Sequence, residues 1–151
     1  MNYRGLVWIY YIALTFSLAV YGMLTYIAYN LLLSISSPDI AVIETNGMMD
    51  NVAILGLVTT VTLLLMASYY FWVTNKAKHF WAVLLYMAIT TIAYYWFFEE
   101  QFHFKKQNGL WKGEFSLSYF GAAIVIVLWS VGIYIAYRLI KYLRKRKMKT
   151  V

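Results

Sequence analysis

Four long stretches of this sequence contain no Asp, Glu, Lys or Arg, and they constrain the fold more than any other feature. They are residues 5–38, 51–75, 79–98 and 115–137, together 102 of the 151 residues. A helix needs roughly 20 apolar residues to cross the hydrocarbon core of a bilayer, and each stretch is long enough. The sequence therefore predicts an all-α integral membrane protein, a single domain over residues 1–151 built as a four-helix bundle. A soluble enzyme and a nucleotide-binding fold are excluded.

The predicted spans follow from the apolar stretches and from the residues that interrupt or end them. They cover about residues 5–36, 51–73, 80–98 and 115–137, and a basic tail occupies 138–151. Pro38 ends the first span, because proline disfavours helical geometry in the preceding residue. Residues 39–50 are predicted to form an outer loop with a turn at Asn46-Gly47. Only residues 74–78 join the second and third spans, so these two should be antiparallel neighbours.

The basic residues are distributed unevenly between the two sides of the predicted spans. With the N-terminus inside, ten Lys and Arg residues fall inside and three fall outside, while all six acidic residues fall outside. An excess of Lys and Arg marks cytoplasmic segments, so both termini are predicted to be cytoplasmic in a multi-pass protein of the cell membrane. The net charge of +7 then reflects topology, and no nucleic-acid partner is implied.

The C-terminal tail concentrates positive charge at the inner membrane surface. Its predicted surface residues are Arg144, Lys145, Arg146, Lys147 and Lys149. Each basic residue near an anionic surface contributes about 1 kcal/mol of attraction, so anionic lipid is a possible partner of this tail. The alternative interpretation is a simple stop-transfer anchor.

Small residues recur at spacings of three and four in three of the spans, which keeps them on one helix face. The sets are Thr15, Ala19, Gly22, Tyr26 and Tyr29; Ala53, Gly56, Thr60, Leu63, Ala67 and Tyr70; and Ser118, Gly121, Val125, Leu128, Gly132 and Ile135. Small side chains let membrane helices approach closely. The predicted helix-packing residues are Gly22, Ala53, Gly56, Thr60, Gly121 and Gly132. The pattern leaves open whether each face packs within the chain or against a partner.

The span interiors offer little ionisable chemistry. No charged residue lies inside a span, which counts against an ion-coupled transporter that works as a single chain. The Ser and Thr hydroxyls are expected to bond back to their own helices, whereas Tyr21 and Tyr86 need hydroxyl partners if they are buried. His79, beside Lys78, is predicted to be a polar residue at the inner boundary.

The clustered ionisable residues best suited to chemistry form an outer collar, which consists of Glu99, Glu100, His103 and Glu114. Glu100-x-x-His103 has the ligand spacing of di-iron helical bundles, but such sites need two of these motifs and two further glutamates. We interpret the collar as interfacial charge, with a metal site or an acid/base pair acting on a lipid headgroup as alternatives. The chain has no cysteine, which excludes thiolate chemistry. No catalytic residue, metal or cofactor is assigned.

Packing signals therefore outnumber chemical ones. The sequence favours a small polytopic subunit, assembly factor or regulator that packs against another integral membrane protein, or a homo-oligomer, within the lipid bilayer. One alternative is a carrier or flippase of a lipid-linked substrate, or an oligomeric pore. A second is a membrane enzyme that acts at the outer interface.

Overall fold

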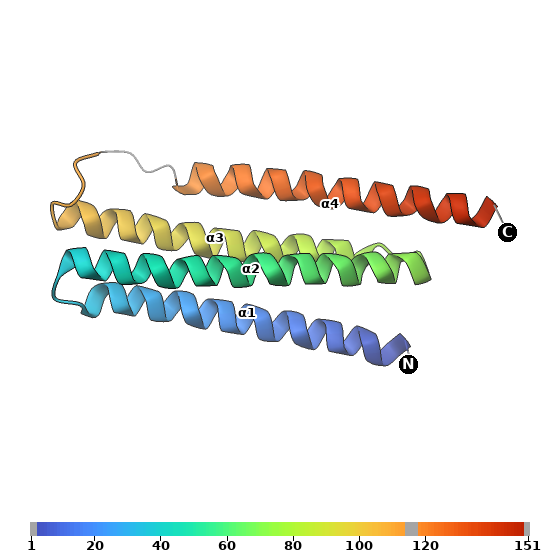
Figure 1. Ribbon diagram of the computed structural model, residues 1–151, viewed down its shortest axis with the longest axis horizontal. Helices are drawn as coiled ribbons and strands as arrows, with labels where there is room; N and C mark the ends of the chain where they lie inside the picture. Colours follow the sequence, from blue (N-terminus) through green and yellow to red (C-terminus); the bar gives the residue numbers. More distant parts are fainter. Residues whose placement is uncertain (1–2, 114–117, 150–151) are drawn as a thin grey trace.

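The computed structural model describes residues 3–113 and 118–149, and within these ranges it consists of four helices. They are α1 (Tyr3–Ser34), α2 (Pro38–Thr74), α3 (Lys78–Gln107) and α4 (Ser118–Lys149). Figure 1 shows them side by side along one long axis, alternating in direction, with both chain ends and the α2–α3 turn at the same end. The prediction of an all-α, four-helix protein is confirmed. Each helix is long and apolar enough to cross a membrane.

The outer loop predicted for residues 39–50 is wrong, because this segment is the first third of α2. Ser37 has extended geometry (φ −99°, ψ 112°) and Pro38 follows as the first helical residue. Proline is favoured there because its fixed φ suits a helix and the N–H it lacks would be unpaired anyway. Thr45 is buried on the inner face, while Asn46 and Gly47 lie on the exposed face, so the turn signal does not interrupt the helix.

The short connection predicted between the second and third spans, at residues 74–78, is confirmed. α2 ends at Thr74 and α3 begins at Lys78. Asn75 adopts a left-handed conformation (φ 59°, ψ 18°), and its N–H donates a 2.9 Å hydrogen bond to the Phe71 carbonyl. Asparagine tolerates this conformation, which closes the helix and reverses the chain.

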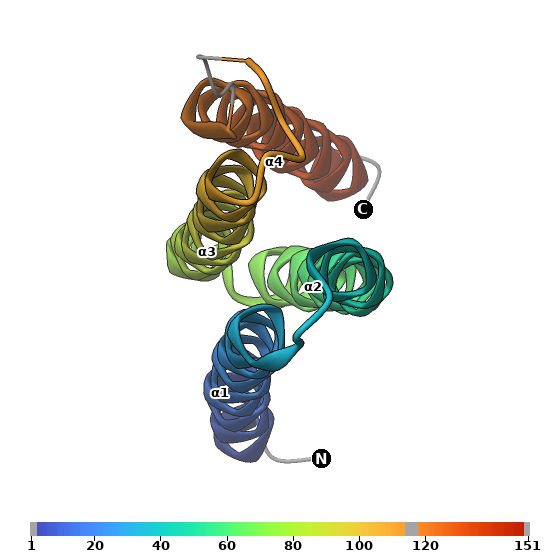
Figure 2. The same cartoon turned by 90° about the vertical axis from the view of Figure 1, so that its left-hand side faces the viewer.

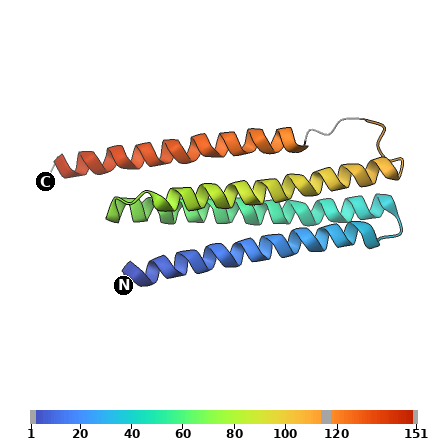
Figure 3. The same ribbon diagram turned by 180° about the vertical axis from the view of Figure 1, so that it is seen from behind.

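Two helices continue well beyond the predicted spans. α3 ends at Gln107 rather than near residue 98, and α4 ends at Lys149 rather than near residue 137. The predicted start of the last span, residues 115–117, lies outside the described residues. Seen from behind (Figure 3), the basic end of α4 projects past the α2–α3 turn. The predicted bounds follow the apolar residues, which indicate only the part of a helix that suits lipid. Backbone hydrogen bonding continues into the polar residues beyond, so the helices are longer than the predicted spans.

The two middle helices form the centre of the molecule. α1 packs against α2 and α3, and α4 packs against α3 and α2. Within the described ranges, no Cα atom of α1 lies within 8 Å of one in α4. Viewed along the bundle (Figure 2), α1 and α4 occupy opposite sides with α2 and α3 between them.

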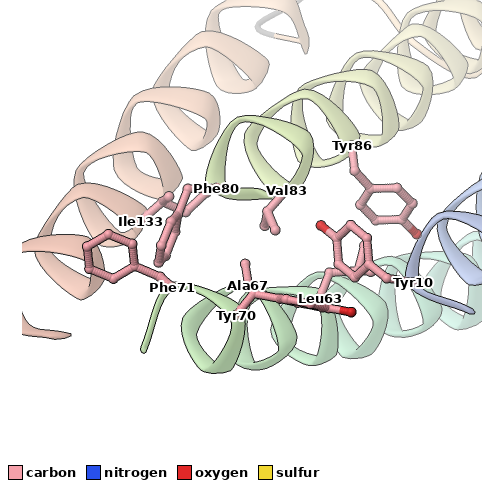
Figure 4. Close-up of a cluster of buried hydrophobic side chains, with 9 residues drawn as sticks. All are labelled: Tyr10, Leu63, Ala67, Tyr70, Phe71, Phe80, Val83, Tyr86 and Ile133. Carbon is pink, nitrogen blue, oxygen red and sulfur yellow. The ribbon is translucent and has the colours of Figure 1, made fainter. Parts of the chain in front are cut away.

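The apolar core divides into two clusters. The larger one, drawn in Figure 4, comprises Tyr10, Leu63, Ala67, Tyr70, Phe71, Phe80, Val83, Tyr86 and Ile133. Fully buried Ala67 and Val83 face each other between α2 and α3, where their small size admits the surrounding rings. The second cluster lies toward the other end and contains Tyr21, Ala28, Met49, Val52 and Phe97.

Hydroxyl groups link the helices at few points. The Ser17 hydroxyl of α1 lies 2.8 Å from the Tyr86 hydroxyl of α3 and donates to Thr59 of α2 over 3.3 Å. The predicted need of Tyr86 for a hydroxyl partner is thereby met. Most other hydroxyls bond back to their own helix as expected, among them those of Thr25, Thr60, Thr62, Ser68, Thr90 and Ser130.

Candidate functional site

The small-residue face of α2 lies in the core. Thr60 is buried, Ala53 is half-buried, and Gly56 lies directly under the ring of Tyr21 from α1. A β-carbon added at Gly56 would lie 3.0 Å from Tyr21 Cε2, which is tighter than ordinary packing. Gly56 is therefore a point of close approach between α1 and α2.

Gly121 marks a second close approach, between α3 and α4. A β-carbon added there would lie 2.7 Å from Cε1 of Tyr95. Tyr95 is half-buried, so its ring has some freedom to move aside.

The other two predicted packing glycines lie on open surfaces. A β-carbon added at Gly22 or Gly132 would have no heavy atom of the described chain within 4 Å. Thr15, Ala19 and Tyr26 are exposed on the same side of α1 as Gly22. We call these four residues, Thr15, Ala19, Gly22 and Tyr26, the α1 small-residue face. The buried face of α1 is a different one, formed by Tyr10, Tyr21, Thr25, Ala28 and Leu32.

The outer collar brings together only two of its members in the described structure. His103 Nε2 lies 3.6 Å from Glu99 Oε1, and the imidazole is 58% exposed. Glu100 is half-buried on the same helix, and Glu114 lies outside the described residues. No group of three His, Asp or Glu residues suitable for a metal ion occurs in the described part of the chain. The described part of the collar therefore contains one Glu–His contact, between an exposed imidazole and a half-buried carboxylate.

The basic tail docks onto the end of α2. Arg144 Nη1 donates a 3.3 Å hydrogen bond to the Phe71 carbonyl in the last turn of that helix, where cations are favoured. The Lys147 ammonium lies 5.6 Å from the centroid of the Trp72 ring. Lys145 and Arg146 are exposed, and Lys149 is the last residue of α4.

His79, predicted as a polar residue at the inner boundary, is buried completely although it is the second residue of α3. Its Nδ1 lies 3.3 Å from the Tyr11 hydroxyl, and its ring lies 4.7 Å from that of Tyr70. The Tyr10 hydroxyl donates to the His79 carbonyl over 3.4 Å. The position beside Lys78 at a helix start gave no signal of burial, since the covering tyrosines come from α1 and α2.

The sequence pattern predicted none of the hollows that lie along α4. A cavity of about 290 Å³ is lined by residues of α2, α3 and α4 and by Tyr21 of α1, and its hydroxyl-bearing residues include Tyr21, Thr91 and Tyr94. A groove of about 440 Å³ lies between α3 and α4 nearer the chain termini. It is lined by Ala77, Phe80, Trp81, Leu84, Ser130, Ile133, Tyr134 and Tyr137.

The described surfaces of the molecule thus include small-residue faces, hollows lined mainly by apolar side chains and a basic helix end. Comparison with family models, curated proteins and solved structures finds no match to this chain. Its function is therefore inferred from the residues and their geometry.

Proposed function

We propose that this chain is a multi-pass protein of the cell membrane, with both termini in the cytoplasm. It works as a subunit, assembly factor or regulator of a larger membrane protein. The α1 small-residue face packs against a helix of that partner, either another integral membrane protein or a second copy of the chain.

Membrane insertion is supported by the surface of the helices. All four carry long apolar segments, and large apolar side chains cover the outside: Trp8 and Phe16 of α1 are each 70% exposed, and Leu65 of α2 is 66% exposed. Soluble monomers rarely expose contiguous apolar patches of more than a few hundred Å². A surface of this kind is suited to lipid.

Sidedness is supported by the charge distribution. Both termini and the α2–α3 turn lie at one end (Figure 1), and this end holds ten of the thirteen Lys and Arg residues. We expect reporter fusions at the C-terminus and at Gly109, between α3 and α4, to report opposite sides, with the C-terminus cytoplasmic. Activity of both fusions on one side would contradict the four-span topology.

The observation that carries the partner proposal is the open α1 small-residue face. Lipid provides no hydrophobic drive between helices, so association depends on close van der Waals packing, which small residues permit. Ala19 and Gly22 lie on this face, and the described chain itself places nothing against Gly22. A helix of a partner could pack closely against these small residues, whereas mobile lipid chains would make fewer van der Waals contacts with them.

The absence of cysteine allows a direct test, because a single introduced cysteine is the only thiol. We expect a photo-crosslinker attached at Ala19→Cys to form a discrete adduct in native membranes, since a partner backbone should approach this face. Leu65→Cys, on an exposed face of α2, is the control and should give only diffuse labelling. Identification of the adduct by mass spectrometry distinguishes a second copy from another protein. Equal, diffuse labelling at both positions would contradict the proposal.

A second candidate function, carriage of a lipid-linked substrate, is favoured by the cavity between α2, α3 and α4. Its volume of about 290 Å³ and its mixture of apolar walls and hydroxyls suit part of an amphipathic lipid. A lipid that co-purifies stoichiometrically in mild detergent would favour carriage, whereas a stoichiometric protein would favour the first candidate.

A further inference from the structure

We propose that the groove between α3 and α4 binds an anionic phospholipid of the cytoplasmic leaflet, with an acyl chain in the groove and the phosphate at Lys141. The leaflet assignment rests on the orientation given under Proposed function. The site itself rests on the shape of the groove and on the charge around its end.

The groove has a floor and walls made by side chains of two helices. Phe80 of α3 and Ile133 of α4 are buried and form the floor, and Figure 4 shows them close together beside Phe71. Trp81 and Tyr134 are largely exposed and form the walls. Every lining residue belongs to α3, α4 or the turn before α3, so the groove faces outward, where lipid would lie.

The groove runs along the axes of α3 and α4, which would lie close to the membrane normal in a bilayer. Ala77 and Tyr137 lie at the end near the chain termini, and Leu84 and Ser130 lie deeper. At 1.5 Å per residue, the seven steps from Ala77 to Leu84 cover about 10 Å. An acyl chain in this groove would point toward the middle of the bilayer and leave its headgroup at the shallow end.

Positive charge surrounds the shallow end. Lys141 lies one turn beyond Tyr137, with Nζ 3.5 Å from the Tyr137 hydroxyl and 5.6 Å from the ring centroid. Lys78 and Arg138 are adjacent in sequence to the lining residues Ala77 and Tyr137, and both are exposed. Asp39, Glu44, Asp50, Glu99 and Glu100 lie toward the opposite ends of their helices, and Glu114 lies in the connection from α3 to α4. The positive charge at the shallow end therefore attracts a lipid with net negative charge more strongly than a zwitterionic lipid.

The test measures lipid binding by native mass spectrometry of the purified full-length protein, with dioleoyl phosphatidylglycerol and dioleoyl phosphatidylcholine as probes. We expect tighter binding of phosphatidylglycerol. Lys141→Gln should weaken that binding about fivefold, because one basic group near the headgroup is lost. It should weaken the binding of phosphatidylcholine less, because the choline group already offsets the charge of that lipid's phosphate. Lys106→Gln, which removes an exposed lysine at the other end of α3, is the matched control and should have no effect.

A second pair of variants tests the groove itself. Ser130→Phe should weaken binding of the acyl chain because the ring occupies part of the groove, and Leu128→Phe on the exposed face of α4 should not. Circular dichroism and gel filtration verify that each variant is folded. Equal affinity for the two lipids, or equal loss in Lys141→Gln and Lys106→Gln, would overturn the site. These measurements need no partner protein, so failure of the partner proposal is seen separately, and an inverted topology would overturn only the choice of leaflet.

Discussion

Replacing Gly56 by leucine is expected to lower the free energy of unfolding by about 1–3 kcal/mol, the usual cost of overpacking a core. A β-carbon added at this position would lie 3.0 Å from Cε2 of Tyr21, whose buried ring packs α1 against α2. A leucine side chain must therefore displace this ring and disturb the contact between the two helices. Unfolding of the purified protein by SDS titration in mixed micelles measures the change.

Gly132→Leu is the matched control for that measurement. It introduces the same side chain into the middle of a helix, but the described chain has no heavy atom within 4 Å of the added β-carbon. Its free energy of unfolding should stay close to that of the wild type. The double variant Gly56→Leu, Tyr21→Ala should lose less than the sum of the two single changes, because the opposing ring is gone. Additive losses, or equal losses for Gly56→Leu and Gly132→Leu, would contradict the assigned contact.

The second large effect is expected on association rather than on folding. Gly22→Leu should weaken binding of the partner by about 5- to 150-fold, the equivalent of about 1–3 kcal/mol of overpacking at a close helix contact. The added side chain meets open space in the isolated chain, so unfolding should not change. Recovery of the partner with the tagged protein from mild detergent measures the loss.

Gly5→Leu serves as the control for association. Gly5 also lies on α1, and an added β-carbon there also meets open space, but it lies near the end of the helix and outside the α1 small-residue face. We expect partner recovery to be unchanged. Undiminished recovery with Gly22→Leu, in a protein shown to reach the membrane, would exclude this face as the contact.

The sequence was most informative for the helices in the middle of the molecule. α2 touches α1, α3 and α4, so its small-residue face must be turned inward, and Gly56, Thr60 and Ala67 are buried there. α3 has the same kind of position, and Tyr86, Thr90 and Phe97 are buried along one face of it. In α2, the spacing of the small residues and the buried stripe coincide.

In the outer helices, the spacing of small residues does not identify the buried face. α1 carries one stripe of small residues and another stripe of large rings, and spacing alone does not show which of the two packs within the chain. The buried stripe through Tyr10, Tyr21 and Ala28 carries rings that fit gaps on α2 and α3, and only tertiary structure reveals that fit. The spacing of Thr15, Ala19 and Gly22 identified a real stripe, but one that lies outside the core of this chain.

The first turns of α2 contain a contact between residues far apart in the sequence, which sequence patterns do not predict. Polar residues at Glu44, Asn46 and Asp50 suggested a loop, yet they lie on the exposed side of a helix. On its buried side, Thr45 accepts a 2.9 Å hydrogen bond from Gln101 Nε2 of α3. A buried amide needs such a partner, and the two residues are 56 positions apart. Neither residue alone predicts the pairing.

The separation of α1 from α4 bears on how the protein is made. Chains emerge from the ribosome N-terminus first. Because the backbone of α1 contacts only α2 and α3, the contacts between these three helices need no residue that is synthesised after Gln107. The first three helices can therefore settle against one another while the ribosome is still translating α4, and α4 then joins a surface that is already formed.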